Sequence, residues 1–162
     1  RIILNNVGGN IYNEESQSNL QKFINAVHDI ESSGGENIYN ESTTAAGDFQ
    51  FKMLTGDGNK EGSAFQTGLN RIENRYNKEN ITIPNWVKEA KEHNDPRKLT
   101  YEQQEELFLI NLYEQKGSDA LIKAMLNGDM KKAMQLYAKF HHTKMNVIND
   151  KIIKEKFNKA YK

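Results

Sequence analysis

The chain of 162 residues contains no cysteine, so disulfides and thiolate chemistry are both excluded. It also lacks a long apolar run. The longest, LFLINLY at 107–113, is far too short to cross a bilayer, and we expect no membrane span. A chain of this length fits one domain with a single hydrophobic core.

The chain also lacks a net charge, because 22 Lys and Arg residues balance 22 Asp and Glu residues. A balanced chain has no general basic field with which to hold a nucleic acid or an anionic membrane, so any charged patch must be local. We therefore expect no nucleic-acid partner.

The chain begins at Arg1, and no basic segment followed by an apolar one opens it. We interpret it as a processed product or as a domain of a longer protein. Residues 1–15 are polar and rich in Asn and Gly, which predicts a loosely ordered segment. Residues 16–162 contain no internal repeat and no long linker, so they are expected to form a single domain.

Helical spacing of apolar residues recurs along most of this domain. Helices are expected from Ser16 or Ser18 to about Glu31, over 65–76, after Pro84, from Thr100 to about Gln115, from Ser118 to Asn127, after Asp129, and over 148–161. The helix from Thr100 is apolar on most sides, which predicts a central position. Residues 32–60 favour loops, tight turns and a small hairpin. The predicted fold is a mainly helical bundle around a central apolar helix, with one irregular insertion.

Glu31 lies at the end of the first predicted helix, in DIESSGG. It follows Val27 by four residues and Ile24 by seven, so a continued helix places its position on the apolar stripe. Partial removal from water raises the pKa of a carboxyl group, and such a group can donate its proton to a leaving oxygen. Periodicity alone, however, equally describes a solvated charge at a helix end, the commoner case.

A second stretch, STTAAGDFQF at 42–51, alternates polar and aromatic residues after a glycine. In an extended segment, Phe49 and Phe51 would lie on one side and Asp48 and Gln50 on the other. Gln50 would then offer a hydrogen-bond donor and an acceptor to a ligand. The alternative is that the two rings only anchor a loop.

Together these stretches resemble the soluble lytic transglycosylase family of the lysozyme superfamily. In that family a Glu-Ser pair ends a helix, as Glu31-Ser32 is expected to do here. A G-A-x-G-L-M-Q loop follows at nearly the same spacing, and Thr44–Gln50 stands in its place, with Gln50 lying 19 positions after Glu31. AAGDFQF is also similar to the A-A-G-R-Y-Q-F stretch of some phage lysozymes.

A third segment, GDMKKAMQLYAKF at 128–140, resembles the family's G-D-x-x-x-A-L-x-A-Y-N-A-G. Tyr137 falls on the tyrosine that borders the catalytic glutamate in that family. The three residues after it, 138–140, are Ala-Lys-Phe and not Asn-Ala-Gly. The resemblance spans about residues 18–142.

The resemblance implies an α+β lysozyme-like fold that cleaves the β-1,4 bond between N-acetylmuramic acid and N-acetylglucosamine in peptidoglycan. Glu31 would be the only catalytic residue, acting first as acid and then as base, and no cofactor or metal is expected. The implied partner is the glycan strand, and the implied place is a phage virion or tail, or another compartment facing the cell wall, within a larger phage structural protein. The residues expected to bind substrate are Ser32, Tyr39, Ser42, Asp48, Phe49, Gln50, Tyr137 and His141.

Two alternatives remain open at this stage. A lysozyme-type muramidase would need a second carboxylate, for which Asp48 is the nearby candidate. A non-catalytic module that binds cell wall or builds part of a virion would fit the altered residues after Tyr137. Two further residues are expected to be structural: His28 faces away from the apolar stripe and is predicted to be solvated, and Trp86 is predicted to be a core anchor.

Overall fold

The computed structural model describes residues 14–32, 39–40, 44–47, 49, 51–114 and 119–141 of the protein, and for 16, 29–32, 39–40, 134 and 138–141 it describes the backbone alone. The segment 1–13 and the helix predicted at 148–161 lie outside the described residues. Within the described part the protein is mainly helical, as predicted. Helix α2 spans Glu14–Ser32, so it begins two residues before the earlier of the two predicted starts.

Two predicted capping signals are confirmed in atomic detail. At the start of α5 (Tyr101–Glu114), the Gln103 backbone N–H donates to Thr100 Oγ1 at 3.2 Å, and the Thr100 N–H donates to Gln103 Oε1 at 3.0 Å. This reciprocal pair satisfies two amides that the helix itself leaves without partners. At the start of α7 (Met130–His141), Asp129 Oδ1 accepts from the Lys132 N–H at 3.3 Å.

The remaining helices are α3 (Ala64–Lys78), α4 (Asn85–His93) and α6 (Asp119–Leu126), with a short 3-10 helix η2 (Pro96–Lys98) between α4 and α5. Ser63 caps α3 by accepting the Gln66 N–H. Pro84 directly precedes α4, where its fixed φ suits a helix start. Trp86 packs against the core, as predicted.

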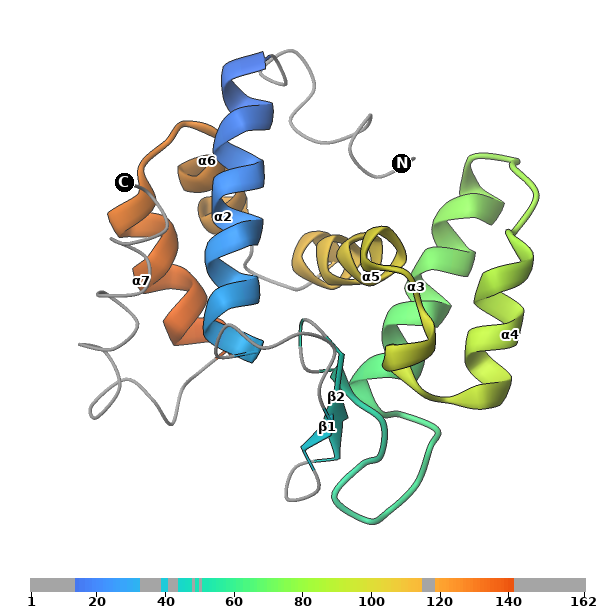
Figure 1. Ribbon diagram of the computed structural model, residues 1–162. Helices are drawn as coiled ribbons and strands as arrows, with labels where there is room; N and C mark the ends of the chain where they lie inside the picture. The colour runs from blue at the N-terminus through green and yellow to red at the C-terminus, as the bar shows by residue number, and fades with distance from the viewer. Residues whose placement is uncertain are drawn as a thin grey trace.

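The helices form two groups with α5 between them (Figure 1). On one side α2, α6 and α7 lie together, and on the other α3 packs against α4. Helix α5 contacts α3 and α6, and most of its residues from Gln104 to Leu112 are buried. Burial around nearly the whole circumference explains why the sequence of this helix is apolar on most sides.

A small antiparallel sheet stands in the region predicted to hold a hairpin. Strand β2 (Ala45–Ala46) pairs with both β1 (Tyr39–Asn40) and β3 (Phe51–Lys52). Residues 47–50 connect β2 to β3, so the Gly-x-x-Gln segment is the link of a hairpin. Phe49 lies in a turn, so the prediction that it belongs to an extended segment was wrong. A three-stranded sheet replaces the predicted two-stranded hairpin because β1 adds a second pairing to β2.

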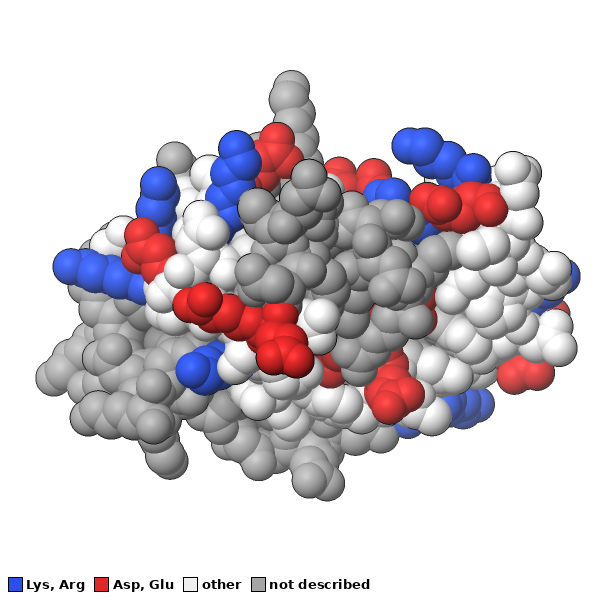
Figure 2. Space-filling model, turned by 90° about the horizontal axis from the view of Figure 1, so that it is seen from above, with Lys and Arg blue, Asp and Glu red and all other residues white. Residues whose placement is uncertain are grey.

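The described side chains include a single large core cluster, to which α2, the hairpin link and every helix from α3 to α7 contribute. Acidic and basic side chains lie among one another on the described part of the face shown in Figure 2. None of the described helices is both long enough and apolar enough to span a membrane.

Candidate functional site

Glu31 and Ser32 are the last two residues of α2, so the helix does continue through the predicted acid. Ile24 and Val27, which precede position 31 by seven and four residues, are fully buried. Helical register therefore places position 31 on the buried stripe of α2. Tyr39 is the first residue of β1 and His141 the last of α7. Ser42, Asp48 and Gln50 lie outside the described residues.

Seven rings form a contiguous group that we call the aromatic cluster: Phe23, His28, Phe49, Phe51, Tyr101, Phe108 and Tyr137. Its closest pair is Phe49 of the hairpin link and Phe108 of α5, whose ring centroids lie 5.0 Å apart with planes only 10° from parallel. Phe51 lies beside Phe49 at 6.3 Å, so the two rings do share one side of the segment as predicted.

Two of the three segments that carry the family resemblance meet in this cluster, and the helix that ends at Glu31-Ser32 contributes Phe23 and His28 to it. Phe49 comes from the hairpin link, and Tyr137 comes from α7. Both rings contact Phe108, Tyr137 at a centroid distance of 6.4 Å. Tyr137 also packs edge-on against Phe23 of α2 at 5.7 Å, two helical turns before Glu31. With exposed fractions of 5% and 3%, Phe49 and Tyr137 present little surface to a ligand, and we assign them a supporting role beneath the site.

The hairpin link is held against α5 at Gly47. Gly47 has φ +86°, which glycine adopts without strain. A Cβ added there would overlap Oε1 of Gln104 and lie 3.1 Å from Cβ of Pro96. Gln104 is almost fully buried and its Nε2 donates to the Leu99 carbonyl at 3.2 Å, so it is not placed to move aside. The link can therefore approach α5 this closely only because position 47 has no side chain.

Thr44, three residues earlier, is a second special backbone position. Its φ of +56° lies in the left-handed region, which β-branched residues rarely occupy. Its carbonyl accepts the Met53 N–H at 2.9 Å, which closes the base of the hairpin. Thr44 stands where the similar family has the first glycine of its loop, a residue that adopts this backbone conformation at no cost.

The prediction that His28 is solvated was wrong. Its ring is half-buried and packs against Phe49 at 5.8 Å and Tyr101 at 5.4 Å. His28 precedes Glu31 by three residues, a spacing that places two positions on neighbouring parts of one helix face. Position 28 lies off the apolar stripe of α2, but Phe49 of the hairpin link and Tyr101 of α5 cover the helix there.

Helix α5 brings buried polar residues that the sequence did not single out. Gln104 and Glu105 are each 1% exposed and Glu106 is 8% exposed. Glu105 follows Tyr101 by four residues and precedes Phe108 by three, so it shares the face of α5 that carries both rings. Glu106 instead accepts from the Tyr76 hydroxyl at 3.3 Å. In the sequence, two adjacent glutamates at 105–106 are typical of a solvated helix face. Their burial in the structure shows that they do not lie on one.

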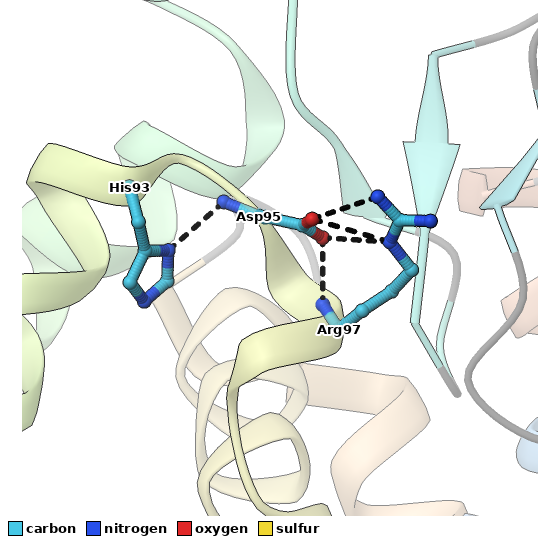
Figure 3. A network of polar contacts seen from close by, with 3 residues as sticks. All are labelled: His93, Asp95 and Arg97. Atoms are coloured by element: carbon cyan, nitrogen blue, oxygen red, sulfur yellow. Dashed lines mark hydrogen bonds and ion pairs between the residues drawn. The ribbon is translucent and has the colours of Figure 1, made fainter.

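The connection from α4 to α5 is fixed by His93, Asp95 and Arg97 (Figure 3). The Asp95 carboxylate accepts from the Arg97 backbone N–H at 3.0 Å and from its guanidinium at 2.8 Å, and the Asp95 N–H donates to His93 Nδ1 at 3.1 Å. The Arg97 side-chain hydrogen bonds hold the pKa of Asp95 below its ordinary value. Burial lowers the pKa of His93, and nearby Lys98 acts in the same direction.

These three residues satisfy one another, which indicates a structural role. The connection sets the position of Pro96, which lies against Gly47, and of Thr100, which starts α5. It thereby fixes where Tyr101 and the aromatic cluster meet the hairpin link. Among the described residues no three His, Asp or Glu side chains are grouped so that they could hold a metal ion.

Comparison of the chain with protein-family models, with curated proteins and with solved structures gives no match. The candidate site therefore depends on the residues and contacts described above.

Proposed function

We propose that the protein is a peptidoglycan lytic transglycosylase whose catalytic acid and base is Glu31. In this proposal the fold is lysozyme-like, with α5 as its central helix and the sheet at residues 39–52 as its small β region. The substrate is the glycan strand of the cell wall, cleaved between N-acetylmuramic acid and N-acetylglucosamine. A virion-associated or otherwise cell-wall-facing location follows from that substrate.

The proposed reaction needs one carboxyl group that changes its protonation state. Protonated Glu31 donates its proton to the glycosidic oxygen while the bond to the anomeric carbon breaks. The resulting carboxylate then takes the proton of the muramoyl 6-hydroxyl, whose oxygen bonds to the anomeric carbon. The product is a 1,6-anhydro sugar, the leaving sugar keeps the first proton, and Glu31 ends protonated. In this proposal Glu31 must begin in its neutral form.

The observation that carries the proposal is the convergence on Phe108. Phe49 and Tyr137 lie 88 positions apart in the sequence, yet both contact this ring, and Tyr137 also contacts α2. A chance similarity in two separate segments gives no reason for them to pack together. The positive φ of Thr44, at the place of a family glycine, supports the same conclusion from the backbone.

A muramidase is the second candidate, with Asp48 as the second carboxyl group beside Glu31. A hydrolase uses two carboxyl groups, roughly 5 to 9.5 Å apart, so that one activates water or attacks the sugar. Asp48 lies outside the described residues.

The proposal is tested by the loss of turbidity of purified peptidoglycan in the presence of the wild type, Glu31→Gln and Glu15→Gln. Glu15 lies exposed in the first turn of the same helix, so its variant controls for the charge change alone. We expect the wild type and Glu15→Gln to clear the suspension equally and Glu31→Gln to be inactive. Activity in Glu31→Gln would contradict the assignment, and an inactive wild type would favour a non-catalytic wall-binding module.

A further inference from the structure

Tyr101 is unusual among the large apolar side chains in the described part of the chain. It is 36% exposed, and the only other such side chain with comparable exposure is Ile81, at 47%. Ile81 lies between α3 and α4, whereas Tyr101 begins α5 and belongs to the aromatic cluster. An exposed ring that is continuous with a buried cluster is a feature that needs a reason, because exposure costs hydrophobic stabilisation.

Two neighbouring rings support the ring of Tyr101. His28 contacts it at a centroid distance of 5.4 Å with an interplanar angle of 70°, and Phe49 contacts it at 5.8 Å. The capping box of Thr100 and Gln103 fixes the backbone from which the ring projects. Little conformational freedom is therefore left for a ligand to remove, and a ring prepared in this way binds at low entropic cost.

Tyr101 is also adjacent to the proposed catalytic helix end. It contacts His28, which precedes Glu31 by one helical turn on α2, and it contacts Phe49 in the hairpin link. A tyrosine joins an apolar ring to a polar hydroxyl, and it suits a partner that has both kinds of surface. A pyranose is such a partner, because its C–H groups form apolar faces and its hydroxyl and N-acetyl groups lie around the rim.

We propose that Tyr101, backed by His28, is a carbohydrate-binding platform on which one N-acetylated pyranose of the glycan strand stacks beside Glu31. This inference rests on the proposed function and names a binding subsite within it. The ring holds the strand and takes no part in proton transfer. Its loss therefore weakens binding and raises KM while kcat changes little, since binding that is equal in the ground and transition states affects KM alone.

The test measures binding of the full chain to insoluble peptidoglycan and to a soluble oligomer of N-acetylglucosamine. All variants carry Glu31→Gln, so that the polymer stays intact. Tyr101→Ala is compared with Tyr101→Trp, which keeps a stacking ring, and with Ile81→Ala, which removes the other exposed apolar side chain. Thermal unfolding of each variant shows that the comparison is made on folded protein.

We expect Tyr101→Ala to weaken binding of both probes about three- to tenfold, while Tyr101→Trp and Ile81→Ala bind as the parent does. When Tyr101→Ala is made in the active protein, which retains Glu31, its KM for peptidoglycan should rise by the same factor. Equal binding by Tyr101→Ala and Ile81→Ala, with an active wild type, overturns the platform and leaves the proposed function intact. A change in oligomeric state on Tyr101→Ala overturns it in favour of a protein interface. An inactive wild type that also fails to bind either probe overturns both proposals.

Discussion

The ring of Phe49 stacks on the ring of Phe108 at 5.0 Å, and this contact joins the hairpin link to α5. Tyr137 of α7 also contacts the ring of Phe108, so Phe108 touches two segments of the candidate site. A side chain shared in this way should matter for activity beyond its contribution to stability.

Phe108→Leu tests that expectation against Phe65→Leu. Both replace a buried phenylalanine with a smaller apolar residue, and each should lower the free energy of unfolding by about 1 to 2 kcal/mol. Phe65 lies in α3, outside the aromatic cluster. Peptidoglycan clearance at a temperature where both variants are folded should fall only in Phe108→Leu. A parallel loss in both variants would mean that stability alone explains the effect.

Gly47→Ala should displace the hairpin link from α5. Alanine in the left-handed region costs about 1 to 2 kcal/mol, and overlap with Gln104 adds a packing cost of similar size. Gly58 has a similar φ of +79°, but nothing lies within 4 Å of an added Cβ. Gly58→Ala should therefore lower the free energy of unfolding only by the backbone cost of the left-handed region. Chemical denaturation of both variants measures the difference, and equal losses would contradict the close approach at Gly47.

Thr44→Gly should keep or raise stability, against the usual effect of adding glycine. Relief of strain worth about 1 to 2 kcal/mol exceeds the extra backbone entropy of about 0.5 to 1 kcal/mol. Thr82, which is exposed and has no positive φ, provides the matched change. Thermal unfolding should place Thr82→Gly below the wild type and Thr44→Gly at or above it. The reverse order would show that Thr44 is not strained.

We expect the protein to lose stability in alkaline solution because of Tyr76. Burial, with the charge of Glu106 and the hydrogen bond to it, raises the pKa of Tyr76 from 10.0 to about 12. The protonated phenol is thus favoured more in the folded state than in the unfolded one. Its contribution to stability is complete below pH 10 and is lost as the pH rises from there to about 12.

The variant Tyr76→Phe isolates this contribution from the other tyrosines and lysines. The difference in free energy of unfolding between the wild type and Tyr76→Phe should shrink between the two pKa values. A difference that stays constant with pH would indicate that the pKa of Tyr76 is not raised in the folded state.

The sequence predicted those features whose cause is local. The starts of α5 and α7 follow from Thr100, Gln103 and Asp129, because a capping side chain bonds to amides within three residues of itself. Such features need no knowledge of distant segments.

Features that depend on tertiary contact could not be predicted in the same way. His28 and Glu105 occupy positions that a single helix leaves open to solvent. Distant segments cover them, so that His28 is half-buried and Glu105 is almost fully buried. The support of Tyr101 by the hairpin link likewise joins residues about fifty positions apart. Periodicity describes one helix at a time, so it assigned His28 to solvent and did not distinguish Glu105 from a surface charge.

The central claim is that Glu31 alone completes the reaction, and mass spectrometry of the muropeptides released from purified peptidoglycan tests it most directly. We predict 1,6-anhydro ends from the wild type and from Asp48→Asn, and no soluble product from Glu31→Gln. Reducing ends from the wild type, or the loss of all product in a folded Asp48→Asn, would contradict it and indicate a hydrolase with two carboxyl groups.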